Sequence, residues 1–415
     1  MKPGDILPLI IERPAAGGAM IARHEGRVVL ATGAIPGERV QGRVIRVQKG
    51  VAHAETVSTD ESSADRRVPP GDPLCGGCLY AHIAYPRQLE IKSQVIADAF
   101  KRIGRLELPT PVTVAGSPEE GYRMRARLHV RGSRFGFFRE GTHDLCDARV
   151  SRQLLPATLD TLERLMAAIH STGVDTVREI ELSENVDASE RVVDLVTSVP
   201  LDRRIAETLM ATDGLTPGPY VTDVIAIGDA TLQLRRHVLA FFQGNRFLLR
   251  DLVSHVVERV PIGGTVADLY AGVGLFSVAA AVTRAASVMA VEGDPQAADD
   301  LHANGLAAGV SVYTVKGSVE GFTAHAFSAL GEMTKGPVVE TVIVDPPRTG
   351  MSPKALEAVL GTRAPRIVYV SCDVATLARD ARKVVDAGYA IERADAFDMF
   401  PNTPHVETVV VFSKA

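Results

Sequence analysis

From about residue 241 onward, short apolar runs alternate with amphipathic segments, and this alternation constrains the fold more than any other feature of the chain. Strands that are apolar throughout are typical of a sheet buried on both faces, and the segments between them are long enough for helices. The pattern predicts a parallel, doubly wound α/β sheet. We expect strands at Val266–Tyr270, Ser287–Val291, Ser311–Val315, Thr341–Val344, Ile367–Val370 and Val406–Phe412, and helices at Leu275–Val282, Gln296–Leu306 and Ala375–Ala387.

The preceding residues follow two other patterns. Short apolar runs with glycine turns such as Gly17-Gly18 and Pro36-Gly37 predict a small β-barrel near the N-terminus. The next region predicts an α+β domain, with a helix from Arg87 to Ile103 and strands near Arg125–Val130, Ile180–Leu182, Val192–Val196 and Val221–Ile227. Because 415 residues are too many for one ordinary core, we expect three domains, at 1–58, 70–240 and 241–415.

Charge, hydropathy and cysteine content indicate the cellular location of the protein and the kinds of partner it can bind. No apolar run reaches the roughly 18 residues of a membrane span, and the N-terminus lacks the pattern of a signal peptide, so we expect no membrane partner. Four cysteines are too few for a disulfide scaffold, which favours a reducing, cytoplasmic location. The net charge of −5 argues weakly against nucleic-acid binding. However, arginines recur from Arg123 to Arg139 without an acidic residue, which fits either phosphate contacts or a solvated strand face.

A glycine turn follows the first predicted strand of the C-terminal region. Gly272 and Gly274 would let the backbone approach a ligand closely, but Ser277 occupies the third glycine position of the dinucleotide pattern. Glu292 ends the next strand, where a carboxylate suits ribose hydroxyls. The combination is typical of S-adenosylmethionine methyltransferases, although each feature alone also occurs as ordinary loop structure.

Three further groups follow strands and are candidates for chemistry. Asp345 precedes two prolines that end a strand, so its carboxylate is fixed at the ligand-binding end of the sheet. Cys372 stands where a strand runs into a helix, which predicts a lowered thiol pKa. Glu407, at the start of the last strand, could accept a proton. Each residue also has a purely structural interpretation: Asp345 would cap a turn, Cys372 would be a buried structural cysteine, and Glu407 would be a charge at the edge of a strand.

With these residues the C-terminal half resembles the RNA 5-methyluridine (uracil-C5) methyltransferase family, which modifies tRNA and ribosomal RNA. The matching segments are Phe242-Gln243-Gly244-Asn245, Asp268 to Gly274, Val291-Glu292, Asn304, Asp345 to Gly350, Tyr369 to Cys372 with Thr376 to Asp380, Phe400-Pro401 and His405-Val406-Glu407. The N-terminal stretch from Gly17 to Glu38 resembles the TRAM domain, an OB-like RNA-binding barrel. The resemblance implies a Rossmann-like methyltransferase domain behind this barrel, with an RNA-binding central domain.

The resemblance also implies the roles of individual residues. Cys372 is the nucleophile that attacks uracil carbon 6, and Glu407 is the base. The residues that would contact the cofactor or the uracil are Gln243, Tyr270, Gly272, Gly274, Glu292 and Asp345. The chain departs from the family at Gly244, Leu275, Asp373 and Asn402, none of which removes a catalytic group.

Three cysteines, Cys75, Cys78 and Cys146, match three of the four that hold a [4Fe–4S] cluster in ribosomal RNA members of the family. Pro69 occupies the place of the first, so a cluster would need Asp72, His82 or another group as fourth ligand. Zinc and a relic site with free thiols are the alternatives.

The combination of barrel and cysteines favours 23S rRNA over tRNA as substrate, for an enzyme expected to be monomeric. A non-catalytic RNA-binding module and a small-molecule methyltransferase are the rival hypotheses.

Overall fold

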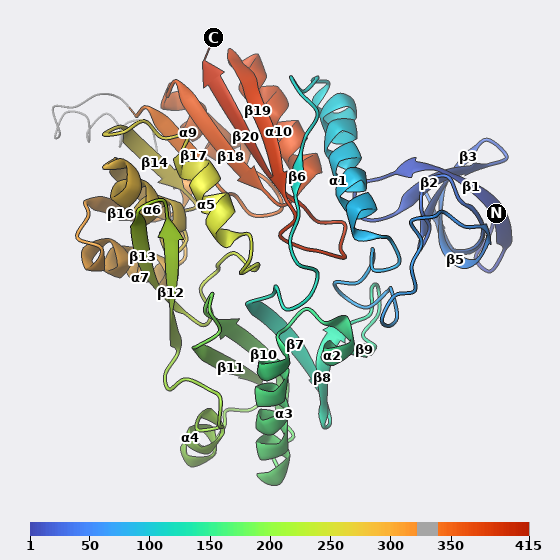
Figure 1. The fold of residues 1–415 in the computed structure, drawn as a ribbon, viewed down its shortest axis with the longest axis horizontal. Helices are drawn as coiled ribbons and strands as arrows, with labels where there is room; N and C mark the ends of the chain where they lie inside the picture. Colours follow the sequence, from blue (N-terminus) through green and yellow to red (C-terminus); the bar gives the residue numbers. More distant parts are fainter. Residues whose placement is uncertain (322–338, 415) are drawn as a thin grey trace.

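The computed structural model describes residues 1–321 and 339–414, and its N-terminal part is a closed five-stranded barrel (Figure 1). Alternate residues along each strand point into the barrel, as the period of a strand requires; on the first strand Leu7, Leu9 and Ile11 are buried between exposed neighbours. The predicted small barrel is therefore confirmed. Its strands are β1 (Ile6–Pro14), β2 (Met20–His24), β3 (Arg27–Thr32), β4 (Arg39–Gln48) and β5 (Val51–Glu61), in the order β1-β2-β3-β5-β4.

The middle of the chain forms an antiparallel five-stranded sheet in the order β11-β10-β7-β8-β9. Its strands are β7 (Arg125–Arg131), β8 (Arg134–Phe138), β9 (Leu145–Asp147), β10 (Val177–Glu184) and β11 (Arg191–Thr197). The helices of this part are α2 (Ala148–Ser151), α3 (Pro156–Ser171) and α4 (Arg203–Met210). The apolar stripe of α3 packs against Ala126, Leu128 and Val130, so the alternate residues of β7, which include its arginines, lie on the opposite face.

The C-terminal part is built on an eight-stranded sheet in the order β16-β15-β14-β17-β18-β20-β19-β6. Its main strands are β14 (Thr265–Leu269), β15 (Ser287–Glu292), β16 (Val312–Lys316), β17 (Thr341–Val344), β18 (Arg366–Ser371), β19 (Tyr389–Phe397) and β20 (Glu407–Lys414). The helices are α5 (Leu249–Val257), α6 (Leu275–Arg284), α7 (Pro295–Ala307), α9 (Pro353–Gly361) and α10 (Val374–Asp386), with a 3₁₀ turn at Val319–Gly321.

The expectation of an entirely parallel sheet is only partly correct. Strands β16, β15, β14, β17 and β18 are parallel, but β20 runs antiparallel to both β18 and β19. The reason is that no helix separates the last two strands: a short loop at Asp398–Val406 connects them directly, and so short a connection returns the chain in the opposite direction.

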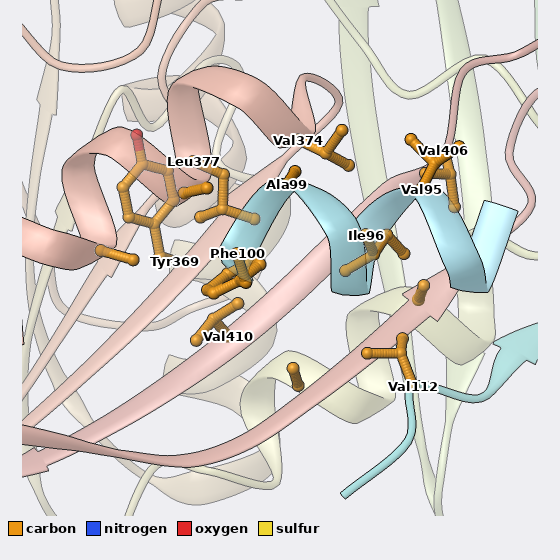
Figure 2. Close-up of a cluster of buried hydrophobic side chains, with 14 of the residues drawn as sticks. Val95, Ile96, Ala99, Phe100, Val112, Tyr369, Val374, Leu377, Val406 and Val410 are labelled. Atoms are coloured by element: carbon orange, nitrogen blue, oxygen red, sulfur yellow. The ribbon is translucent and has the colours of Figure 1, made fainter. Parts of the chain in front are cut away.

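Two segments that precede residue 241 also pack on the C-terminal sheet. Helix α1 (Tyr85–Ala99), continued by a π-helical turn (Phe100–Gly104), lies beside α10 over β20 (Figure 2). Strand β6 (Val114–Ala115) joins the edge at β19, and the hairpin of β12 (Tyr220–Ile227) and β13 (Ala230–His237) packs on α5, α6 and α7. The labelled apolar side chains in Figure 2 form one cluster and come from α1, the π-helical turn, β18, α10 and β20, with Val112 before β6 and Val406 just before β20. Helix α1 therefore stabilises the end of the sheet where Val406 leads into β20.

A buried ionic cluster connects the central sheet to the segment that enters the C-terminal part. Glu184 at the end of β10 forms ion pairs with Arg191 and with Arg246. Arg236 on β13 pairs with Asp223 at 2.6 Å and donates to the Glu184 carbonyl at 2.6 Å. Removing one member of such a cluster would leave a buried charge unpaired, so the cluster fixes the chain on both sides of residues 237–245. Within residues 1–321 and 339–414, none of the helices combines the length and the apolar run needed to cross a bilayer.

Candidate active site

A cavity of about 660 Å³ opens at the carboxyl ends of the parallel strands, where ligands bind in open α/β sheets. Residues from the ends of β14, β15, β17, β18 and the start of β20 contribute to its wall, together with residues 239–244 and two arginines of the central region. The lining residues are Arg123, Arg125, Leu239, Phe241, Phe242, Gln243, Gly244, Tyr270, Gly272, Glu292, Asp294, Ala297, Asp345, Pro346, Pro347, Arg348, Cys372, Phe400 and Glu407.

Strand register places Cys372 beside Glu407. Ser371 pairs with Thr408 across the antiparallel strands β18 and β20. The next residue along β18 and the preceding residue along β20 are therefore neighbours at the same edge. Glu407 is 2% exposed and its Oε1 atom has no hydrogen-bond partner among the described residues. A thiol and an unpartnered carboxyl group thus face one cavity.

Asp345 lies on the same wall, held by a residue from the opposite side of the cavity. It follows β17, whose last residue, Val344, pairs with Leu269, so Tyr270 and Asp345 are adjacent at the strand ends. The Nε2 atom of Gln243 donates to Oδ2 of Asp345 at 3.1 Å. Tyr270 has a φ of +65°, an uncommon conformation for a residue with a large side chain, and a feature that recurs at ligand sites.

The glycine turn and Glu292 also meet as one unit. The backbone N–H of Gly272 donates to Oε2 of Glu292 at 2.7 Å, and that of Asp294 donates to Oε1 at 2.6 Å. A Cβ atom on Gly272 would have only one neighbour, the Phe241 carbonyl at 4.0 Å, so the backbone there faces open cavity. Gly274 has a φ of +94° and is packed against Leu301, so its role is in the turn itself.

Ser277, which breaks the dinucleotide glycine pattern, donates a hydrogen bond to the buried carboxyl group of Asp268. Sequence reasoning did not single out Asp268 as a candidate site residue. The Ser277 hydroxyl donates to Oδ2 of Asp268 at 2.5 Å, and Oδ1 of Asp268 has no partner among the described residues. Burial raises the pKa of Asp268 to about 7, despite the hydrogen bond from Ser277, and the nearby Glu292 adds to the rise.

We predict that Asp268→Asn stabilises the protein at pH 8 and not at pH 4. A folded-state pKa raised above the unfolded one gives stability that is present below about pH 4 and is lost as pH rises through about 7. Asparagine removes the buried charge, so the variant should gain on the order of 2–3 kcal/mol at pH 8. Urea unfolding of both proteins across this pH range measures the difference, with the exposed Asp229→Asn as control. A stability difference that does not change with pH would contradict the prediction.

The pKa of the Cys372 thiol is raised, not lowered as the sequence suggested. Burial, with the adjacent Glu407, raises it to about 12, and the guanidinium of Arg348 opposes the rise. Asp373 caps the N-terminus of α10: its Oδ1 accepts from the N–H groups of Ala375 at 3.1 Å and Thr376 at 2.8 Å. Asp373 thus fills the capping role for which asparagine is equally suited.

Burial and a neighbouring carboxyl group raise the pKa of both Asp345 and Glu407. Burial raises the pKa of Asp345 to about 7, with Asp268 contributing and Gln243 opposing. Burial also raises the pKa of Glu407 well above its ordinary value, with Asp345 contributing and Arg348 opposing. A carboxyl group of raised pKa is a stronger base once ionised, so this environment suits a residue that must take a proton from carbon.

The arginine run divides into three groups in the structure. Arg123 and Arg125 line the cavity, whereas Arg127 pairs with Glu181 and Arg139 pairs with Asp72. The remaining members, Arg131 and Arg134, are exposed near the β7–β8 hairpin. The run is therefore not one continuous phosphate-binding stripe, because acidic side chains from other strands neutralise part of it. Two members remain at the cavity, where a polyanion would meet them.

The three N-terminal cysteines do not fit a metal centre. Cys75 and Cys146 are joined in a disulfide, and Cys78 is a buried free thiol whose pKa burial raises to about 11. Among the described residues no group of three histidine, cysteine or acidic side chains is arranged to hold a metal.

Both side chains considered as a fourth ligand are engaged elsewhere. Asp72 accepts from Arg139 at 2.8 Å and from the Leu74 backbone at 2.8 Å. His82 is buried against the Ala34 carbonyl, and burial lowers its pKa to about 4. The structure therefore does not support a cluster or zinc site at Cys75, Cys78 and Cys146: two of the three thiols are bonded to each other, and Asp72 and His82 make other contacts.

Several lining residues were missed by sequence reasoning. Phe241 and Phe400 are aromatic positions on the cavity wall, and Arg348 was quoted only as part of a motif. Asn402, a departure from the family, stabilises the loop of Phe400 because its Oδ1 accepts from Arg67 at 2.8 Å and from Gln88 at 2.9 Å. These contacts join segments more than 300 residues apart, so no local pattern announces them.

Comparisons with known proteins agree with this geometry. Residues 215–415 match the model of the tRNA (Uracil-5-)-methyltransferase family, and residues 1–57 match that of the TRAM domain. An uncharacterised RNA methyltransferase of Corynebacterium efficiens is 32% identical over 100% of this chain and 96% of its own length. A 23S rRNA (uracil(1939)-C(5))-methyltransferase of Halomonas elongata is 32% identical over 97% of this chain and 88% of its own length.

A solved structure shares the whole fold. The Pyrococcus abyssi tRNA (uracil-54, C5)-methyltransferase, crystallised with S-adenosyl-L-homocysteine, superposes with a TM-score of 0.74 at 24% identity. The superposition covers 97% of this chain and 99% of the other. At this identity the likeness supports the arrangement of the barrel, central region and eight-stranded sheet.

Proposed function

Because the chain belongs to the RNA uracil-C5 methyltransferase family and carries a TRAM domain, we propose that it methylates one uridine of 23S rRNA, with Cys372 as the nucleophile. The observation that carries the mechanism is the pairing of β18 with β20, which brings a thiol and a buried carboxyl group to one cavity. We further propose three working units: the barrel at 1–58, an RNA-binding region at 70–240 and the methyltransferase region at 241–415.

The reaction needs a nucleophile because carbon 5 of uracil is itself unreactive. The Cys372 thiolate adds to carbon 6, forming a carbon–sulfur bond and displacing the ring electrons towards carbon 5 and O4. Arg348, whose positive charge opposes the rise in the thiol pKa, favours this thiolate. Carbon 5 then takes the methyl group. Glu407 accepts the proton that carbon 5 must lose, and the bond from carbon 6 to sulfur breaks as the double bond returns.

S-adenosylmethionine supplies the electrophilic methyl group when it is bound. The residues present fit it: the cavity is large enough for a nucleoside, and the open backbone at Gly272 leaves room that a side chain would fill. Each Glu292 oxygen accepts one backbone N–H, Oε2 from Gly272 and Oε1 from Asp294, so each keeps a lone pair for a ribose hydroxyl. We propose that Tyr270, Gly272, Gly274 and Glu292 hold the cofactor, and that Gln243 and Asp345 place the uracil beside it.

The substrate assignment to 23S rRNA rests on the Halomonas relative, whose printed activity names that RNA. The alternative is tRNA, the substrate named for the Pyrococcus neighbour. The target uridine must leave its base stack to reach Cys372, because the cavity is recessed at the strand ends. Such a substrate brings phosphate groups to the cavity, and Arg123 and Arg125 are the positively charged residues of the central region that line it.

We predict that loss of the gene removes 5-methyluridine from a single fragment of 23S rRNA. Nuclease digestion and mass mapping of total RNA from cells with and without the gene measure this. Purified protein with S-adenosylmethionine should restore the methyl group on rRNA from the deletion strain. Loss from tRNA instead would keep the chemistry and overturn the rRNA assignment. Absence of any change, with no restoration in vitro, would favour a non-catalytic RNA-binding module.

A further inference from the structure

The turn Cys75-Gly76-Gly77-Cys78 is packed so closely that both glycines are needed where they stand. The N–H of Gly76 donates to the Phe138 carbonyl at 2.9 Å, and a Cβ atom on Gly76 would lie 2.9 Å from that oxygen. Gly77 has a φ of +85°, and a Cβ atom there would lie 2.4 Å from the amide of Gln153. The glycines between the cysteines are therefore explained by packing against β8 and Gln153.

Gln153 uses its whole amide to join this turn to the catalytic cavity. The side chain is 1% exposed. Its Nε2 atom donates to the Gly76 carbonyl at 3.0 Å, and its Oε1 atom accepts from Nη1 of Arg123 at 2.9 Å and from the Tyr122 hydroxyl at 3.3 Å. Its backbone carbonyl accepts from the Arg123 N–H at 3.0 Å. Because Oε1 accepts from two donors and Nε2 donates to a carbonyl, these contacts fix the orientation of the buried amide.

Arg123 is the member of this network that reaches the cavity. Its guanidinium lies 5.4 Å from the centre of the Phe137 ring and is bonded to Gln153, so two neighbours fix its direction. In the part of the chain that the structure describes, no carboxylate forms an ion pair with it, in contrast to Arg127 and Arg139. An unpaired, oriented guanidinium beside a site for RNA is suited to a phosphate.

We propose that Gln153 is a positioning residue that holds Arg123 against the RNA backbone at the cavity, and that the disulfide-fastened turn Cys75–Cys78 is its anchor. Cys75 is bonded to Cys146, close in sequence to Gln153, so the bond fastens the turn to the segment that carries the glutamine. This proposal deepens the proposed function, because it assumes that RNA enters beside Cys372.

The test is RNA binding by Gln153→Met, which keeps the side-chain volume and removes the amide. Binding is measured to a 23S rRNA transcript and to a tRNA transcript, and the tighter probe is used. We expect affinity to fall about tenfold, the size of one charge-assisted hydrogen bond, and kcat to change by less than about twofold. The slope of log affinity against log salt should fall by about one, because one phosphate contact is lost.

Two comparisons distinguish loss of Arg123 positioning from a general loss of folding stability. Arg123→Ala with Gln153→Met should bind no more weakly than Arg123→Ala alone, because the glutamine acts through the arginine. Asn185→Ala removes another buried amide, bonded to the Thr222 carbonyl at 3.0 Å, and should lower stability without changing the salt slope. An unchanged slope in Gln153→Met, or additive losses in the double variant, would overturn the proposal. Methylation of the same transcripts by the wild-type protein tests the proposed function independently of the role of Gln153.

The disulfide that anchors the turn can be tested separately by counting free thiols. The unreduced protein, unfolded in denaturant, should show two titratable thiols out of four, from Cys78 and Cys372. Cys75→Ser with Cys146→Ser should lower the salt slope as Gln153→Met does, whereas Cys78→Ser should not. Four free thiols, or stoichiometric iron or zinc in the purified protein, would overturn the anchor.

Discussion

Cys372→Ala is expected to lower the rate of methyl transfer by about 10⁴-fold or more while RNA affinity stays within about twofold of the wild type. Among the described residues that line the cavity, Cys372 supplies the only thiol, the group suited to add to carbon 6 and leave again. Electrostatic and positioning effects from Arg348 and Asp345 remain in the variant, but they act on an addition that no longer takes place. Radiolabelled methyl transfer and filter binding measure the two quantities.

Cys78→Ala is the matched control for this experiment. Cys78 is the other free cysteine of the described structure and is buried beside Cys146, outside the cavity of Cys372. The same cysteine-to-alanine change there should leave turnover at the wild-type level. Measurable turnover by Cys372→Ala, above the level of an enzyme-free reaction, would remove Cys372 from the role of nucleophile.

The fold of the C-terminal region was predictable from the sequence because its strands are apolar throughout and its helices are amphipathic. The strand predicted at Thr341–Val344 agrees with β17 at both ends, and those at Ser287–Val291 and Ile367–Val370 lie within β15 and β18. Strand β19 was missed because its middle, Ile391-Glu392-Arg393, carries charges on an exposed stretch. The antiparallel direction of β20 depends on how short its connection is, which apolar periodicity does not report.

The candidate residues were found because parallel strands end at one edge of a sheet. Cys372, Asp345 and Tyr270 each follow a strand, so the topology alone brings them together. The pKa of Cys372 could not be predicted in this way. It depends on the burial of the thiol and on Glu407, which comes from the antiparallel neighbour β20. The contacts of Gln153 were equally hidden, since they join residues 30 and 77 positions apart.

Glu407→Gln is expected to trap the RNA on the enzyme as a covalent adduct. After methyl transfer, carbon 5 still carries its proton, and the bond from carbon 6 to Cys372 cannot break until a base removes it. Glutamine cannot accept that proton, so steady-state turnover should fall by about 10²–10⁴-fold, the usual contribution of a positioned base. One equivalent of methyl group per enzyme should nevertheless reach the RNA. A band that migrates slowly in denaturing gels and disappears with nuclease measures the adduct.

Glutamine is an informative replacement because it resembles the protonated form of the carboxyl group. Burial and Asp345 raise the pKa of Glu407, which favours the protonated form that glutamine resembles, so the variant disturbs the charge of the cavity less than the loss of an ordinary carboxylate would. Attack by Cys372 should therefore proceed in the variant, and only the step that needs an ionised Glu407 should fail. The double variant Cys372→Ala with Glu407→Gln should form no adduct. Loss of both turnover and adduct in Glu407→Gln alone would instead assign Glu407 to an earlier step, removal of the thiol proton.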